Sequence, residues 1–293
     1  MSLATPESIQ ELQRKLYLKA KQEPTYRFYA LYDKVYRDDI LVHAYHLAKA
    51  NGGAAGVDDM RFADIEKYGV GRFLVELRQE LQERRYRPEA VLRVMIPKPN
   101  GGERPLGIPT IKDRVVQTAV KLVLEPIFEA DFTDDAYGYR PQRSAVQAVK
   151  AVHQALKAGF SQVVDADLSK YFDTIPHAEL MRSVSRRVSD GTILHLVKMW
   201  LKAPVEETDE RGNRQLSGGK KVTRGTPQDG AGLDHHDELH HKEERHVQPE
   251  ERDAWRMATS GGLAATGQKR SHRSGSVHGA CGRRWRHSRG PDR

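Results

Sequence analysis

Cysteine is almost absent from this sequence of 293 residues, in which Cys281 carries the single thiol. One thiol excludes a disulfide within the chain and is typical of proteins that stay in a reducing compartment. No apolar run approaches the ~20 residues that a membrane-spanning helix needs. The N-terminal residues MSLATPESIQELQRK also lack the apolar centre of a signal peptide. The sequence therefore predicts a cytoplasmic protein that has no contact with a membrane.

Apolar residues are also scarce, at 38% of the chain, whereas charged residues reach 30%. The 48 Lys and Arg residues outnumber the 40 Asp and Glu residues, which leaves a formal net charge of +8. A positive excess favours a polyanionic partner, although an excess of this size is weak evidence by itself. The composition predicts no particular oligomeric state.

Hydrophobic periodicity predicts a mixture of helices and strands. A glycine-rich loop at 51–56 separates an N-terminal helical region from the rest. Amphipathic helices are expected within 7–50 and over 73–85, 111–128, 144–158 and 193–201. Strands are expected over 91–97 and 106–109, around an Asn100-Gly101 turn, and in a second hairpin over 205–215.

The first predicted hairpin carries a cation on either side of its turn, Lys98 and Arg104. Both side chains donate hydrogen bonds, and a guanidinium can hold two phosphate oxygens in a fork. The pair could therefore bind a triphosphate, but two cations on a hairpin are more commonly solvated surface. The residues alone leave both interpretations open.

An aromatic loop, DAYGYRP at 135–141, precedes the helix expected over 144–158. Tyr139 could stack on a nucleobase, and Arg140 could bind phosphate next to the helix N-terminus. A packed loop with two aromatic side chains explains the same residues equally well.

The stretch VVDADLSKYFDTIPH at 163–177 combines apolar residues with carboxylates. Two valines lead into Asp165 and Asp167, a pattern that predicts a short buried strand ending in acidic side chains. A buried carboxylate is costly unless a cation, a helix N-terminus or a metal ion compensates its charge. Because Pro176 is typical of a helix start, a simple helix cap is the alternative to a metal ligand.

Five blocks of this sequence, in this order, resemble the reverse transcriptase/maturases encoded by group II introns. The blocks are GAAGVDD (53–59), IPKPNGGERPLGIPTIKDRVVQ (96–117), DAYGYRPQRSA (135–145), VVDADLSKYFDTI (163–175) and RGTPQ (224–228). The resemblance implies an α/β (α+β) right-hand polymerase with fingers and palm. It implies that such a protein copies RNA into DNA from deoxynucleoside triphosphates.

The resemblance also assigns roles to single residues. Asp167, helped by the carbonyl of Leu168, would bind the two Mg²⁺ ions of the palm, since these ions require anionic oxygen ligands on a rigid strand. The residues implied to bind the nucleotide are Lys98, Arg104, Phe172, which would block a ribose 2′-hydroxyl, and Gln228. Those implied to lie near the template or other RNA are Tyr139 and Arg140.

The same resemblance implies four segments and a set of partners. The segments are a helical, RNA-binding N-terminal extension (1–85), fingers (86–160), an incomplete palm (161–229) and a disordered tail of unrelated sequence (230–293). The implied partners are intron RNA, an RNA template with a DNA primer, and dNTP substrates.

The second carboxylate pair of the family, a Tyr-x-Asp-Asp motif after the glutamine loop, is missing from this sequence. Phe132-Thr133-Asp134-Asp135 has a similar shape, but it precedes the first carboxylate strand, so we do not assign it this role. The sequence therefore predicts that this chain is inactive as a polymerase. The alternatives are a non-catalytic RNA-binding splicing cofactor and a nonfunctional remnant.

From residue 230 onward Ile, Phe and Tyr disappear, and such a tail lacks the apolar surface needed to fold. The change is abrupt and falls after Gln228, inside a family motif. We therefore hypothesise that the chain is C-terminally truncated by a frameshift. Sequencing the gene tests this hypothesis. An alternative reading frame downstream that encodes Tyr-x-Asp-Asp would support it, and the absence of such a frame would rule it out.

Overall fold

The computed structural model describes residues 3–97, 101–166, 171–208 and 213–226. The helices are α1 (Glu7–Gln22), α2 (Tyr32–Val35), α3 (Asp38–Asn51), α4 (Phe62–Tyr68), α5 (Val70–Gln82), α6 (Ile111–Glu129), α7 (Ala145–Lys157), α8 (Tyr171–Thr174), α9 (His177–Ser185) and α10 (Gly191–Leu201). The strands are β1 (Val91–Pro97), β2 (Glu103–Ile108), β3 (Pro204–Thr208) and β4 (Arg214–Gly218). The predicted mixture of helices and sheet is confirmed. None of the described helices is both long and apolar enough to cross a membrane.

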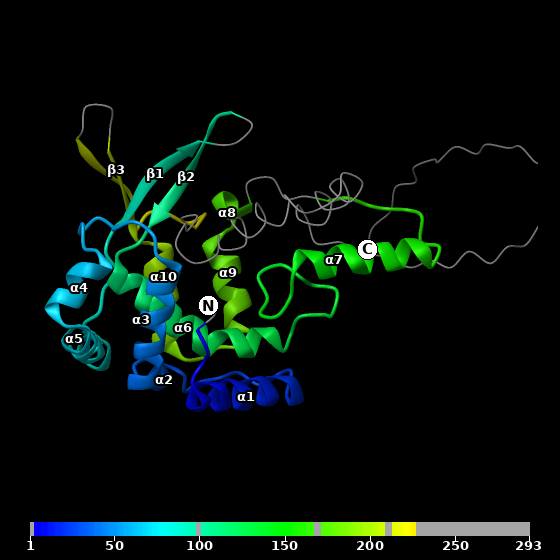
Figure 1. Cartoon of the computed structure of the whole chain (residues 1–293), viewed down its shortest axis with the longest axis horizontal. Helices are drawn as coiled ribbons and strands as arrows, with labels where there is room; N and C mark the ends of the chain where they lie inside the picture. Colours follow the sequence, from blue (N-terminus) through cyan, green and yellow to red (C-terminus); the bar gives the residue numbers. More distant parts are fainter. Residues whose placement is uncertain (1–2, 98–100, 167–170, 209–212, 227–293) are drawn as a thin grey trace, which may run out of the picture.

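The four strands form one sheet in the order β2-β1-β3-β4. β1 pairs with β2 as the predicted antiparallel hairpin, and β3 pairs with β4 as the second one. The two hairpins are joined by a parallel pairing of β1 with β3, in which Val91 lies opposite Val205. In Figure 1 the sheet stands at one end of the molecule, above the helices α3, α6 and α10. This parallel pairing brings together segments more than a hundred residues apart in the chain.

The hydrophobic core lies between the N-terminal helices and α6. α6 begins where the Thr110 hydroxyl accepts a hydrogen bond from the backbone N–H of Asp113 (3.2 Å), which satisfies a donor of the first turn. α6 packs against α1 and α3 through the buried side chains of Val115, Val116, Ala119, Val123 and Ile127. The predicted segments 1–85 and 86–160 therefore share one core.

The segment 161–166 differs from its prediction. The sequence predicts a buried strand beginning at Val163, but the described residues here belong to no strand, and Val164 is 75% exposed. A strand is stable only where a neighbour pairs with its backbone and covers one face. The described sheet offers this segment no such neighbour. Asp167 and the other residues of 167–170 lie outside the described part of the chain.

A short segment, 187–190, ties the N-terminal helices to α10. The Arg187 guanidinium donates to the carbonyl of Ala20 (2.6 Å) at the end of α1 and pairs with Asp131 (3.0 Å). Asp190, three residues later, accepts hydrogen bonds from four backbone N–H groups, those of Leu31 (2.8 Å), Tyr32 (2.9 Å), Thr192 (2.9 Å) and Ile193 (3.2 Å). One carboxylate therefore caps both α2 and α10.

We predict that Asp190→Asn destabilises the fold by about 2–4 kcal/mol, because an amide NH₂ replaces one accepting oxygen and leaves two buried N–H donors unpaired. Burial raises the pKa of Asp190, but the four N–H donors together outweigh it, so the pKa is lowered overall. Because the pKa is lower in the folded protein, the ionised carboxylate stabilises the fold at pH values above its pKa in the unfolded state, which is about 4. This stabilisation is lost as the pH falls below that value.

Urea unfolding followed by circular dichroism over a pH series checks this prediction. The difference in the free energy of unfolding between Asp190→Asn and the unaltered chain should be largest near neutral pH and should decrease as pH falls below about 4. Asp33→Asn, on an exposed carboxylate beside Lys34, is the matched control and should change stability by less than about 0.5 kcal/mol. An Asp190→Asn protein as stable as the control would contradict the double-cap role.

Candidate functional site

The β1–β2 hairpin holds the first candidate site residue within the described chain, Arg104. Arg104 lies opposite Ile96 in the antiparallel register and is half-buried. Gly101 and Gly102 precede β2 with φ of 83°, a left-handed conformation that glycine adopts without steric cost. Lys98, the other predicted triphosphate ligand, lies outside the described residues.

Two motifs that are far apart in the sequence meet at a second place. The backbone N–H of Thr226 donates to the carbonyl of Phe172 (2.8 Å), and the N–H of Gly225 donates to the carbonyl of Ile175 (2.9 Å). The N–H of His177 completes the set by donating to the carbonyl of Thr223 (2.9 Å). The structure therefore joins the 171–177 segment to the 223–226 loop. Gln228, the predicted pocket residue after this loop, lies outside the described chain.

Phe172 sits at this junction with its ring partly free. It is 42% exposed and contacts Tyr171 edge to face, with 5.5 Å between ring centroids. Its backbone is fixed by the hydrogen bond from Thr226, so the ring position depends on the 223–226 loop.

Gly225 and His177 hold the junction together, and sequence reasoning missed both. Gly225 has φ of 79°, and a Cβ atom there would lie 2.7 Å from the carbonyl oxygen of Asp173. His177 is buried, and its Nε2 lies 2.6 Å from the carbonyl oxygen of Gly225, which fits an N–H donor. The glycine inside RGTPQ could have indicated this junction from the sequence. Only glycine adopts a left-handed conformation while another backbone segment lies so close to its Cα atom.

Arg114 links the glycine-rich block 53–59 to the start of α6. Its guanidinium donates to the carbonyls of Pro109 (3.0 Å) and Gly52 (3.0 Å), and also to that of Ala54. A Cβ at Gly56 would lie 2.8 Å from the backbone of Thr110. The glycines of this block therefore serve close packing beneath the hairpin.

A buried network of hydrogen bonds next to Arg114 fixes the chain segment that leads into β1. The Tyr86 hydroxyl donates to Asp113 (2.6 Å) and accepts from the indole N–H of Trp200 (3.1 Å), while Asp113 also accepts from the N–H of Glu89 (3.0 Å). Burial raises the pKa of Asp113, and the hydrogen bonds oppose this only in part. The network joins the α5–β1 connection to α6 and α10.

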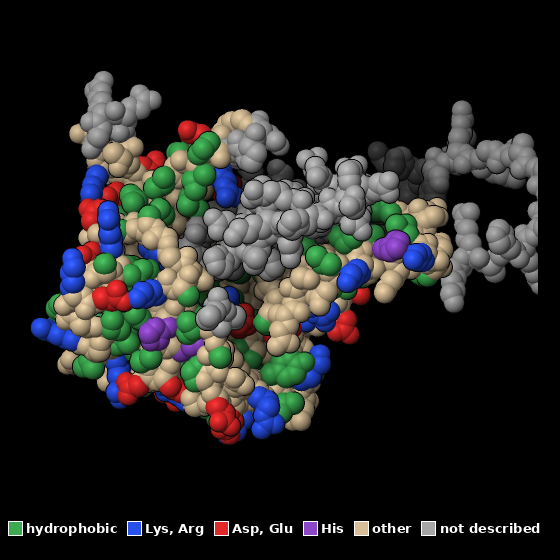
Figure 2. All heavy atoms as spheres, viewed as in Figure 1, with side chains coloured by type: hydrophobic (Ala, Val, Ile, Leu, Met, Phe, Trp, Pro, Cys, Tyr) green, Lys and Arg blue, Asp and Glu red, His purple; other side chains and the backbone are tan. Residues whose placement is uncertain are grey.

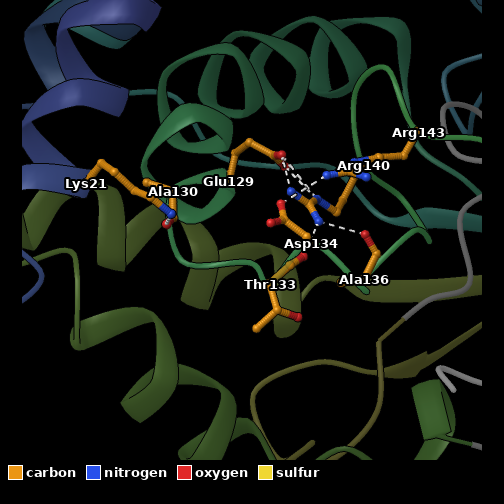
Figure 3. A network of polar contacts seen from close by, with 8 residues as sticks. All are labelled: Lys21, Glu129, Ala130, Thr133, Asp134, Ala136, Arg140 and Arg143. Atoms are coloured by element: carbon orange, nitrogen blue, oxygen red, sulfur yellow. Dashed lines mark hydrogen bonds and ion pairs between the residues drawn. The ribbon is translucent and has the colours of Figure 1, made fainter. Parts of the chain in front are cut away.

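Arg140, predicted to lie near the template or other RNA, is engaged by the protein itself in this structure. Its side chain is 5% exposed, and Figure 3 shows it directed into the loop that leads from α6. The guanidinium pairs with Glu129 (2.6 Å) and donates to the carbonyls of Thr133 (2.6 Å) and Ala136 (2.6 Å). These contacts use its donors, so Arg140 orders the loop 132–140. The sequence could not indicate this, because a motif shows that an arginine is present but not whether its side chain is buried or faces RNA.

Tyr139, beside Arg140, points the other way. It is 67% exposed and has φ of 56°, a left-handed conformation that is uncommon for a bulky residue. Such a conformation persists only where the surroundings enforce it, and the contacts of Arg140 supply that constraint.

A cavity of about 970 Å³ lies next to both loops. Pro141 of the aromatic loop and Thr226 of the 223–226 loop both line it. Its walls come from α1, α3, α6 and α10, and include Gln13, Leu47, Gln117 and Trp200. The cavity therefore joins the two loops that the sequence proposes for nucleotide and template.

No metal centre can be built from the described residues. No group of three or more His, Cys, Asp and Glu side chains among them lies close enough to hold one ion. The predicted ligands Asp167 and Leu168 lie outside the described chain, while Asp165 is in the exposed segment 161–166.

Comparisons with known proteins agree with this arrangement. Residues 96–231 match the family model "Reverse transcriptase (RNA-dependent DNA polymerase)". Protein YkfC of Escherichia coli is 39% identical over 204 residues, which cover 67% of this chain and 52% of YkfC. The group II intron-encoded protein LtrA of Lactococcus lactis is 34% identical over 206 residues, which cover 69% of this chain and 32% of LtrA.

The matched motifs define a domain of the reverse transcriptase family, and the chain belongs to the family of group II intron reverse transcriptase/maturases. It spans about half the length of YkfC and about a third of LtrA. Among solved structures, a partial Cas6-RT-Cas1–Cas2 complex aligns with a TM-score of 0.41 and 19% identity, over 69% of this chain and 32% of that one.

We predict that Gly225→Ala separates the 223–226 loop from the 171–177 segment. The added Cβ would meet the Asp173 carbonyl, so hydrogen exchange at the Thr226 and His177 amides should accelerate by about tenfold or more. Gly219→Ala is the matched control, because Gly219 has φ of 83° but no atom within 4 Å of its Cβ position. It carries the same backbone strain and should leave both amides protected. Equal protection in Gly225→Ala would contradict the close approach.

Proposed function

We propose that this chain carries the nucleotide-binding side of an RNA-directed DNA polymerase site. The proposal rests on one observation above the others: Phe172 and the 223–226 loop, both from motifs of the family, are in backbone contact. The β1–β2 hairpin, which carries Arg104, leads directly into α6, whose buried face forms the core. The natural reaction would be the synthesis of DNA on an RNA template from dNTPs.

The proposed roles follow the chemistry of each side chain. Lys98 and Arg104 would bind the triphosphate, since both are permanent cations and donors at neutral pH. Phe172 would exclude a ribose 2′-hydroxyl by occupying its space. Gln228 would line the base pocket.

Asp167 and the carbonyl of Leu168 are the proposed ligands of Mg²⁺. Both offer the hard oxygen atoms that this ion prefers. When bound, two such ions would stabilise the attacking and leaving oxygens of an in-line nucleotidyl transfer. The segment assignments follow: we propose 1–85 as an intron RNA-binding extension, 86–160 as fingers and 161–229 as part of the palm.

We further propose that the chain by itself does not extend primers. The sequence contains no Tyr-x-Asp-Asp motif, and the second carboxylate pair of the family is therefore missing. Without it, the negative charge that develops during phosphoryl transfer would lose much of its metal-based stabilisation. The same observation favours a second function, a non-catalytic cofactor that binds intron RNA during splicing.

Primer extension on an RNA template with Mg²⁺ and dNTPs tests the inactivity. We expect no extension from the chain or from Asp167→Ala. Extension by the chain that disappears in Asp167→Ala would show that another carboxylate completes the site, and the proposed inactivity would be wrong. If neither protein extends the primer, intron RNA binding with a steep salt dependence would separate the cofactor from a remnant.

Nucleotide selectivity tests the proposed role of Phe172 without requiring turnover. The chain, with an RNA template and DNA primer, is incubated with labelled dNTP or rNTP and Mg²⁺, and bound nucleotide is measured by photo-crosslinking. Phe172→Ala should bring dNTP and rNTP binding to the same level, because the ring no longer excludes the 2′-hydroxyl. Tyr171→Ala, a neighbour with 45% exposure, should keep the preference. If the unaltered chain, Phe172→Ala and Tyr171→Ala all prefer dNTP over rNTP to the same degree, Phe172 does not exclude the 2′-hydroxyl.

A further inference from the structure

The single helical turn α8 carries Phe172, but apolar packing does not hold this turn in place. None of the side chains of α8 is buried, and so short a helix is not stable by itself. Figure 2 shows hydrophobic side chains at many points of the molecular surface, so the exposure of Phe172 alone indicates no function. The position of α8 therefore depends on contacts of its backbone.

The 223–226 loop supplies such contacts. The carbonyl of Phe172, within α8, accepts a hydrogen bond from the N–H of Thr226 (2.8 Å). The carbonyl of Ile175, directly after α8, accepts one from the N–H of Gly225 (2.9 Å). The place of the Phe172 ring is therefore set by the place of the loop, because the loop binds the backbone on which the ring stands.

His177 binds the loop at two points. Its backbone N–H donates to the carbonyl of Thr223 (2.9 Å), and its Nε2 lies 2.6 Å from the carbonyl oxygen of Gly225. A carbonyl oxygen can only accept, so Nε2 carries a proton and donates it. The imidazole ring is 7% exposed, which shields this hydrogen bond from competing water. One residue thus fixes two carbonyl groups of the loop.

The helix α9 gives His177 a fixed base. His177 is its first residue, and the helix begins with a hydrogen bond from the N–H of Leu180 to the carbonyl of Pro176 (3.0 Å). α9 packs against α10, whose side chains Ile193 and Leu196 belong to the hydrophobic core. His177 therefore connects the 223–226 loop to a part of the molecule that the core holds.

We propose that His177 is a positioning residue for the selection of the nucleotide sugar. The hydrogen bond from its Nε2 to the Gly225 carbonyl holds the 223–226 loop, and the loop holds Phe172 where its ring excludes a ribose 2′-hydroxyl. His177 acts through the loop and not on the nucleotide itself. The inference rests on the proposed function in one respect, that Phe172 contacts the sugar.

Three replacements of His177 test the donor, with the dNTP preference over rNTP measured by photo-crosslinking of the full chain on an RNA template and DNA primer. His177→Phe keeps a ring but has no donor. The amide nitrogen of Gln can take the place of Nε2, whereas that of the shorter Asn reaches only the place of Nδ1. We expect His177→Phe and His177→Asn to lower the preference about 3- to 10-fold, as for one lost hydrogen bond, and His177→Gln to restore it.

Hydrogen exchange separates release of the loop from a general loss of stability. In His177→Phe the amides of Gly225 and Thr226 should exchange about 3- to 10-fold faster, while the amides of α6 should keep their protection because α6 lies in the core. Faster exchange in α6 as well would mean that His177→Phe destabilises the whole fold. The comparison of His177→Gln with His177→Asn then decides, and an equal dNTP preference in these two variants would overturn the inference.

The outcomes distinguish this inference from the proposed function. If Phe172→Ala abolishes the dNTP preference and His177→Phe keeps it in full, the inference is overturned and the proposed function stands. If His177→Phe lowers the preference, His177→Gln restores it and Phe172→Ala leaves it unchanged, control by His177 is supported and the proposed role of Phe172 is wrong. A full preference in both Phe172→Ala and His177→Phe would overturn both roles.

Discussion

The burial of α6 is the constraint on which the rest of this structure depends. Its apolar face packs against α1 and α3, so the N-terminal helices and the region after the hairpin form one core. Its ends carry charged side chains that bind neighbouring segments of the chain. At one end Asp113 and Arg114 fix the entry to β1 and the glycine-rich block. At the other end Glu129 pairs with Arg140.

The candidate site is built by buried polar groups that position exposed aromatic rings. Arg140 is buried and fully engaged, and Tyr139 next to it is exposed. His177 is likewise buried against the Gly225 carbonyl, and Phe172 nearby keeps part of its ring free. In both cases the hydrogen bonds stabilise a loop conformation, and the ring is then available to a ligand without a further ordering cost.

The sheet and the segment 187–190 connect parts of the chain that are far apart in the sequence. β1 pairs in parallel with β3, and Asp190 caps helices from both parts of the chain. Early and late segments are therefore mutually dependent for stability.

The sequence by itself determined the local elements and the family. The Asn-Gly turn predicted the first hairpin, the apolar periodicity predicted α6, and five motif blocks identified group II intron reverse transcriptases. These features depend on residues near one another in the chain. The roles assigned to the site residues remain predictions: Lys98, Arg104, Tyr139, Arg140, Asp167, Leu168, Phe172 and Gln228.

Only the tertiary structure decided what each motif residue contacts. It turned Arg140 inward, left Val164 exposed where a buried strand was expected, and joined Phe172 to the 223–226 loop. A side chain is buried or exposed according to partners that arrive from distant parts of the chain. A local pattern specifies which residues can pair, but the long-range packing around α6 selects the pairs that form.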